Sequence, residues 1–526
     1  MRGSWRIAGF TLLSRILGLV RDQLQFNLLG ARWENAMFVN AWLVPNLFRS
    51  LFGEGALSAA FVPAFTRTLD AEGKDAARRL LAAVTGTLVA ALGALLLLVL
   101  VGLWLLPPGV LAPPVRGGAG GIAQEALLRD LIGILFPYML PICMVALFTG
   151  AANATGRFGA PSIAPAVLNA VWIGVLLFVS VAGPTDLEDK VRLMCWALLG
   201  GGLVQLGLLI AGLWQAGLLV WPDFSFRHPG LREVLRTMGP MVVGLSVVQL
   251  NVLVDQEVAL HWVPREGANT LVYLGNRLLL FPQALVGTAM ATAVFPLLSL
   301  LGGRKDDAEL GRVLGKALSL AEFLALPAAA GLFVLAPEIL DILFRHGRFT
   351  AQDSAETAWV LRSLVAGLPF MTANQIQVRA LYALGETKAP VRIAVALLVL
   401  NLALNLILSL PLGVAGLAVS TSICALLNCV FLQRALARRG IHQITRTIAP
   451  SLFRSLSCAV GMALVVALLV WGLTPAAGSR RLARGVLLVV VPIVGGAATF
   501  FALSRAMGGQ ELRALLARDG RDRPAV

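Results

Sequence analysis

Long apolar segments recur along almost the whole chain and are separated by short polar or charged stretches. A membrane-spanning helix needs about 20 mostly apolar residues. A window of that size predicts fourteen helices at 5–29, 34–64, 79–106, 127–152, 161–183, 191–219, 233–262, 268–300, 311–336, 355–384, 389–410, 413–437, 448–473 and 482–507. The breaks at 152/161, 262/268 and 410/413 are the weakest. The pattern predicts an all-α polytopic membrane protein.

A weak internal repeat divides this series. Phe136-Pro137 followed by Gly156 to Pro161 resembles Leu368-Pro369 followed by Gly385 to Pro390, and both glycine elements end in Ala-Pro. The repeat predicts two pseudo-symmetric six-helix lobes, as in parallel-repeat transporters. Chance matches between helices rich in Gly, Ala and Pro remain the alternative. The predicted domains are the lobes 1–219 and 220–438, two additional helices within 439–507, and a basic tail at 508–526.

Composition agrees with a membrane protein. The 526 residues are 58% hydrophobic and 13% charged, whereas soluble domains carry about a quarter charged residues. The net charge of +15 comes from Arg and Lys scattered between apolar spans, without a basic domain or base-stacking motif. This distribution excludes nucleic acid as a partner and indicates cytoplasmic loops facing anionic membrane lipids.

The basic loops also predict the orientation. Basic residues concentrate at 67–79, 227–236, 304–316 and 434–446 and in the tail, whereas the loop at 186–189 is acidic. Positive loops stay in the cytoplasm, so both termini are expected there, although Arg480, Arg481 and Arg484 run against the pattern. Arg15 and Arg21 interrupt the first apolar segment, which is therefore expected to be a retained helix rather than a cleaved signal peptide.

Several kinds of chemistry find no support. The five cysteines are an odd number in apolar stretches, and no Cys or His pair has metal-ligand spacing, which argues against disulfides and zinc. No phosphate-binding glycine motif occurs. A membrane-embedded enzyme such as a glycosyltransferase would need a paired-carboxylate or metal-binding surface loop, and none is found. The chain is not expected to be an enzyme or to require a cofactor.

The most informative residues are charges inside the first two helices. One such charge at the centre of a span costs about 2.5–3.5 kcal/mol on insertion scales, so these side chains must face water, one another or a ligand. Helix two also carries Pro45 and Gly53, which can break it as transporter binding sites require. The candidate substrate-binding residues are Ser14, Arg15, Arg21, Asp22, Asn46, Arg49, Glu54 and, in helix eight, Arg277.

Two interpretations of these charges compete. They could neutralise one another as structural pairs, Arg21 with Asp22 and Arg49 with Glu54. The arginines outnumber the acids, however, so self-pairing leaves a positive surplus. Arginine binds phosphate and carboxylate through its planar fork. We therefore favour a cationic cavity for an anionic ligand.

A second set of polar residues lies in the C-terminal lobe. Asp255 is in helix seven, Asn401 and Asn405 share one face of helix eleven, and Thr421 is in helix twelve. Carboxylate, amide and hydroxyl oxygens suit a hard cation, so the set is a candidate sodium site, or a site for a titrating proton. Interhelical hydrogen bonding is the alternative, and it is favoured for the Asn and Thr residues taken alone.

At this point the chain resembles the MurJ/MviN family, the lipid II flippases of the MOP exporter superfamily. The resemblance covers essentially all predicted helices. Its motifs are Ser14-Arg15-x-x-Gly18-x-x-Arg21-Asp22, Pro45-Asn46-Leu47-Phe48-Arg49, Glu54-Gly55-Ala56, Ala60-Phe61-Val62-Pro63, Asn276-Arg277 with Phe281-Pro282, and Phe344-Arg345-His346-Gly347 with Phe349-Thr350.

The resemblance implies a V-shaped pair of lobes and a groove for the polyprenyl tail formed by the last two helices. It implies that Arg15, Arg21, Arg49 and Arg277 engage the diphosphate and head group of lipid II, supported by the other candidate residues. It also implies alternating access, driven by membrane potential or a cation gradient such as sodium at Asp255. Two departures, Ala36 and Leu280 where some relatives are acidic, remove negative charge from the cavity.

The expected function is therefore the transfer of lipid II, the lipid-linked peptidoglycan precursor, across the bacterial inner membrane by a monomer. A cation-coupled multidrug exporter is the alternative, but it would need an acidic or aromatic cavity rather than arginines. An exporter of other lipid-linked polysaccharides fits the charge and fits the motifs less well. The coupling ion, the resting conformation and the peptide stem of the substrate do not follow from the sequence.

Overall fold

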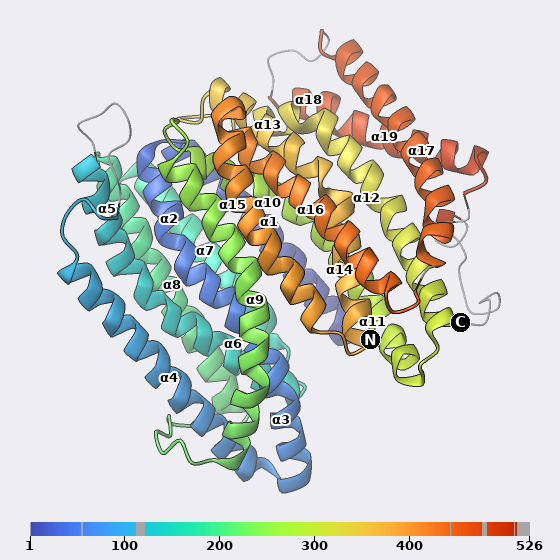
Figure 1. Ribbon diagram of the computed structural model, residues 1–526. Coiled ribbons are helices and arrows are strands. Elements are labelled where there is room, and N and C mark those ends of the chain that lie inside the picture. The colour runs from blue at the N-terminus through green and yellow to red at the C-terminus, as the bar shows by residue number, and fades with distance from the viewer. Residues whose placement is uncertain are drawn as a thin grey trace. The chain divides into compact units, whose positions relative to one another are not determined.

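A computed structural model describes residues 2–53, 56–111, 121–441, 443–475, 481–509 and 511–512. These residues form helices and connecting loops without a β-strand (Figure 1), which confirms the predicted all-α class. Glu54, a predicted site residue, and the tail from 513 lie outside the described residues. The chain forms two compact units: one comprises 1–270 with 346–349, and the other comprises 271–345 with 350–526.

The first unit contains the helices coloured blue to green in Figure 1. They are α1 (Arg2–Leu29), α2 (Trp33–Phe48), the π-helix η1 (Arg49–Gly53), α3 (Ala56–Glu72), α4 (Lys74–Leu105), α5 (Gly121–Leu135), the 3-10 helix η2 (Phe136–Tyr138), α6 (Met139–Ala154), α7 (Gly159–Val181), α8 (Leu187–Gln215) and α9 (Pro229–His261).

The second unit contains the remaining helices, the first of which begins three residues before the boundary at 271. They are α10 (Ala268–Pro282), the π-helix η3 (Gln283–Thr288), α11 (Ala289–Arg304), α12 (Asp307–Leu343), α13 (Ala351–Ala366), α14 (Leu368–Ala383), α15 (Lys388–Leu412), α16 (Val414–Ala437), α17 (Gln443–Leu473), α18 (Arg481–Gly485), the π-helix η4 (Val486–Val490) and α19 (Val491–Ala506).

Ten helical segments of the described residues are long and apolar enough to cross a membrane. The other four predicted spans correspond to α1, to α2 with α3, to α9, and to α13 with α14. Two of these four are divided into shorter helices, α2 with α3 and α13 with α14. The exact count of fourteen stays a prediction.

The repeat has a counterpart in local structure. Gly156 after α6 and Gly385 after α14 adopt φ of +74° and +72°. The amides of the following residues, Arg157 and Glu386, donate back to the carbonyls of Ala152 and Leu381 at 2.9 and 2.8 Å. Each glycine therefore ends its helix with the same left-handed turn, which a residue with a Cβ adopts less readily. A second shared feature is a π-helix, η1 or η3, followed by a helix with an internal proline, Pro63 or Pro296.

The structure includes α9 in the first unit, whereas the repeat places residues 220–270 with the second lobe. Local turns and π-helices do not decide which helices belong to one lobe. The domain division at 219/220 therefore stays a prediction.

A polar corner fixes α1 against α2 within the first unit. Gly30 has φ of +63°, and its carbonyl accepts a hydrogen bond from Asn35 Nδ2 at 2.7 Å. Asn35 Oδ1 in turn accepts from Gln25 Nε2 at 2.9 Å, and neither side chain is appreciably exposed. The segment 346–349 packs on this corner, because Arg348 N donates to Asn27 O at 3.0 Å and the rings of Phe349 and Phe26 lie 5.7 Å apart.

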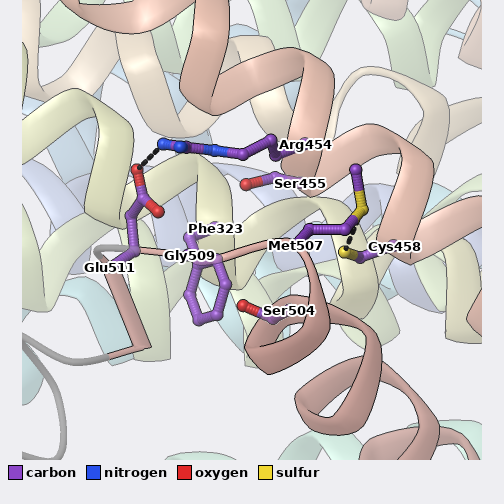
Figure 2. A pocket seen from close by; sticks show the side chains of 8 residues that line it. All are labelled: Phe323, Arg454, Ser455, Cys458, Ser504, Met507, Gly509 and Glu511. Carbon is purple, nitrogen blue, oxygen red and sulfur yellow. Dashed lines mark hydrogen bonds and ion pairs between the residues drawn. The ribbon is translucent and has the colours of Figure 1, made fainter.

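Within the second unit, α12 packs against the last helices, α17 and α19. The Phe323 and Phe500 rings are 4.9 Å apart, and Met462 and Leu512 are buried in the same cluster. Figure 2 shows a small cavity at this place, where Arg454 of α17 and Glu511 point toward one another at 3.5 Å. This ion pair connects Glu511, which follows α19, to α17.

Candidate substrate-binding site

The two central charges of α1 form a buried ion pair. Arg21 Nε donates to Asp22 Oδ1 at 2.9 Å, and Arg21 Nη2 contacts the same oxygen. The side chains are only 8% and 4% exposed. Neighbouring residues on a helix do not usually face each other, so the arginine has to fold back along α1. The structural interpretation considered for this pair is therefore correct for Arg21 and Asp22.

Helix α7 completes the environment of Arg21. Arg21 Nη1 donates to Asn169 Oδ1 at 3.0 Å, and the guanidinium lies 4.2 Å from the centroid of the Trp172 ring. Asn169 Nδ2 donates in turn to the Ser14 carbonyl at 3.0 Å. Sequence reasoning missed both α7 residues, and the available signal was an amide one helical turn before a tryptophan in an otherwise apolar helix.

Three aromatic rings extend from this arginine through the interior of the first unit. Trp172 lies 5.6 Å from Trp42, and Trp42 lies 5.3 Å from Tyr138. Tyr138 is fully buried, its hydroxyl has no hydrogen-bond partner, and it is close enough to Arg21 and Arg49 to experience both charges. These rings lie on α2, η2 and α7, so no sequence pattern connects them to the arginines.

Arg49 occupies the first position of the π-helix η1. Its Nε donates to Asn46 Oδ1 at 3.1 Å, so this predicted pair of residues is brought together. A π-helix leaves a local irregularity in the backbone and is frequent at functional sites. Pro45, one turn earlier in α2, removes a backbone donor just before this irregularity. The break predicted in helix two is therefore present.

Arg15 differs from Arg21, because its side chain is exposed on α1 while Ser14 beside it is partly buried. No membrane is present in the structure, so this exposure means contact with either water or lipid. A charged side chain avoids lipid. Arg15 is therefore available to a polar ligand, whereas Arg21 is already engaged.

In the second unit, Arg277 is exposed on α10, six residues before the π-helix η3. Two polar contacts join the following elements to α14: Thr288 Oγ1 donates to Gln375 Oε1 at 3.1 Å, and Arg379 Nη1 donates to Thr292 Oγ1 at 2.9 Å. Gln375 and Arg379 were not among the predicted site residues. They show that α14 presents a polar side to the helices that follow Arg277.

The predicted sodium ligands are divided between the two units. In the first, Asp255 is buried and Asn251 Nδ2 lies 3.5 Å from its Oδ2. In the second, Asn401 and Asn405 are fully buried, and Ser420 donates to Asn405 Oδ1. Thr421 donates to the Leu417 carbonyl of its own helix at 3.0 Å. The described residues hold no group of three or more His, Cys, Asp or Glu suited to a metal, and a sodium site stays a prediction.

Two solved structures have a similar fold. A structure of lipid II flippase MurJ in an inward closed conformation matches with a TM-score of 0.76 at 22% identity, covering 97% of this chain and 99% of that one. An inward-facing multidrug resistance MATE family transporter of the MOP superfamily matches with a TM-score of 0.62 at 15% identity, covering 81% and 95%. The chain therefore has the fold that these two structures share.

Sequence comparison identifies the family. The family described as lipid II flippase MurJ matches residues 26–482. A probable lipid II flippase MurJ of Vibrio cholerae is 34% identical over 445 residues, 84% of this chain and 83% of its own length. The lipid II flippase MurJ of Burkholderia cenocepacia is 32% identical over 470 residues, 88% and 87% respectively. The chain belongs to the MurJ family of lipid II flippases, and it is a multi-pass membrane transporter rather than an enzyme.

Proposed function

We propose that this protein moves lipid II, a muropeptide on undecaprenyl diphosphate, from the cytoplasmic to the outer leaflet of the bacterial inner membrane. Family membership supports this substrate. The observation that carries the proposal is the positive charge of Arg15, which is exposed on α1, while Arg21 on the same helix is paired with Asp22.

The arginines then divide into two roles. Arg15, Arg49 and Arg277 bind the diphosphate and the head group through charge-assisted hydrogen bonds. Arg21 positions α1 against α7 and keeps Asp22 from presenting an unpaired carboxylate to the anionic substrate. Ser14, Asn46 and Glu54 support the site as hydrogen-bonding neighbours.

Transport by alternating access needs elements that change conformation at a small free-energy cost. The π-helices η1 and η3 are suited to this, because each interrupts regular α-helical hydrogen bonding close to a proposed binding arginine. Membrane potential or a sodium gradient supplies the driving force. The residues predicted to bind sodium are Asp255 in the first unit and, in the second, Asn401, Asn405 and Thr421.

A cation-coupled multidrug exporter is the second candidate, because MATE transporters share the fold. Its substrates are cationic, and the positive charge of Arg15, exposed on α1, would repel them. The charge therefore favours an anionic lipid-linked saccharide.

The protein is proposed to act as a monomer with both termini in the cytoplasm. Cysteines introduced singly into the 67–79 and 301–316 loops should react with a membrane-impermeant reagent only after the inner face is opened. Labelling of these loops from the outside would contradict the orientation.

Complementation tests the proposed function. The gene should restore growth to a strain depleted of its own lipid II flippase, and Arg15→Ala, Arg49→Ala and Arg277→Ala should not, at equal membrane levels. Lysine at these positions should restore part of the activity, because it keeps the charge without the bidentate fork. Growth supported by all three alanine variants would contradict the assignment of these arginines.

A further inference from the structure

One carboxylic acid in the second unit has no role in the transport site described above. Glu322 is the sixteenth residue of the 37-residue helix α12, which is long and apolar enough to span the membrane. The residue is 5% exposed, and its Oε2 atom has no hydrogen-bond partner. Ala321 and Leu318 beside it belong to the apolar core of this unit.

Helix α16 contributes a thiol near Glu322, and α14 contributes an amide near that thiol. Gln377 of α14 is 2% exposed, and its Oε1 atom also has no partner. The Gln377 side chain lies within hydrogen-bond reach of Cys429 on α16, and Glu322 is close enough to act electrostatically on the same thiol. Helix α14 packs against both α12 and α16, and all three contribute to one apolar core cluster. We call Glu322, Gln377 and Cys429 the α12 polar cluster.

Charged groups on the surrounding elements are engaged elsewhere. Arg379 of α14 donates to Thr292, and Arg454 of α17, which lines the cavity of Figure 2 with Phe323, lies against Glu511. Arg312 at the start of α12 pairs with Glu309. Within the described part of the chain, Glu322 forms no ion pair.

The α12 polar cluster lacks hydrogen-bond donors for two of its oxygen atoms. A carboxylate has only acceptor atoms, and the oxygen of an amide side chain is an acceptor as well. Glu322 Oε2 and Gln377 Oε1 are therefore two buried acceptors without a donor. Burying a charged carboxylate without a counter-ion costs far more than burying a neutral acid. A single proton on Glu322 removes the charge and converts one acceptor into a donor.

A metal cation satisfies the same cluster less well. Hard cations require several oxygen ligands, whereas a thiol is a soft ligand. Two side-chain oxygens and the thiol of Cys429 make a poor shell for sodium.

We propose that Glu322 is a proton-binding site of the second unit, occupied while α12, α14 and α16 pack as observed. A rearrangement that admits water to the cluster releases the proton, so proton binding favours this packing over any hydrated one. The site is distinct from the arginines and from the proposed sodium ligands, and it does not depend on the identity of the transported lipid.

Infrared difference spectroscopy of the purified full-length protein tests this directly. A protonated carboxylic acid has a carbonyl stretch that a carboxylate lacks and that shifts in deuterium oxide. At neutral pH, Glu322→Gln should remove one such band. The matched control is Glu309→Gln on the same helix, whose acid is paired with Arg312 and should contribute no band.

A second variant and the pH dependence of thermal stability test the same proton-binding site. Glu322→Asp retains the acid and should move the band rather than remove it, which covers the case that the glutamine variant does not fold. Thermal stability of the wild-type protein should fall as pH rises above neutral by more than that of Glu322→Gln. An unchanged carbonyl region in both Glu322 variants would overturn the proposal. Sodium-dependent stabilisation that only Glu322→Gln abolishes, without a lost band, would also overturn it in favour of a cation.

Discussion

Replacing Arg21 by alanine should separate folding from substrate binding more clearly than any other single change in the site. Arg21 pairs with Asp22, donates to Asn169 and covers the ring of Trp172. The substitution leaves the Asp22 carboxylate in place, only 4% exposed, without this cation. The variant should therefore lose stability before any question of lipid binding arises.

The magnitude follows from the burial of the pair. Removing one partner of a buried ion pair costs about 3–5 kcal/mol, because the remaining charge is left uncompensated. The cation–π contact contributes about 0.5–2 kcal/mol, and the two terms overlap rather than add. We expect a loss of about 3–5 kcal/mol for Arg21→Ala. Arg15→Ala, at an exposed position on the same helix, should stay within about 0.5 kcal/mol of wild type.

Thermal unfolding of the purified variants in detergent measures this difference. The double variant Arg21→Ala/Asp22→Ala should be more stable than the sum of the two single changes predicts, because it removes both charges. Equal stability of Arg21→Ala and Arg15→Ala would refute the structural role assigned to Arg21. Additive losses in the double variant would refute the pairing.

Three further predictions rest on other parts of the chain. Gly347→Ala should lower thermal stability by more than about 1 kcal/mol, because φ is +55° and the added Cβ would overlap Asn27, while the helical Gly303→Ala, with open space around it, should not. Hydrogen bonding to Arg439 lowers the pKa of Glu386. The pair therefore stabilises the folded protein at neutral pH, and this stabilisation is lost as pH falls through the lowered pKa. The melting temperature of Glu386→Gln should accordingly fall less on acidification than that of the wild-type protein. Asp255→Asn should remove any sodium-dependent thermal stabilisation and leave lipid II binding intact, and stabilisation that persisted would reduce Asp255 to helix packing.

The sequence predicted the all-helical class, because apolar length is a local property. Two of the predicted helices, 34–64 and 355–384, are each divided in the structure. The weak breaks at 152/161, 262/268 and 410/413 are real, and Gly156, Gly267 and Gly413 have positive φ there. The pairing of Arg49 with Asn46 also followed from residues close together in the chain.

Contacts between distant helices could not be predicted in the same way. Asn169 and Trp172 are far from Arg21 in the sequence, and nothing in the α7 pattern specifies which helix its polar side faces. The internal pairing of Arg21 with Asp22 was considered but not preferred, because charge counting gives the surplus and not the partner of each arginine. Glu322 was not among the predicted site residues, because a single acid in an apolar helix forms no spacing motif.

The central claim is that Arg15, Arg49 and Arg277 bind lipid II as it crosses the bilayer. The most direct measurement follows fluorescent lipid II crossing the membrane of proteoliposomes that contain the purified protein, with Arg392→Ala, at an exposed position of α15, as the control. A lost charge-assisted hydrogen bond costs about 1.5–3 kcal/mol, or roughly tenfold to a hundredfold in binding. The account predicts transfer by wild type and Arg392→Ala, and transfer reduced by that factor or more in Arg15→Ala, Arg49→Ala and Arg277→Ala. Wild-type rates in all three arginine variants would contradict it.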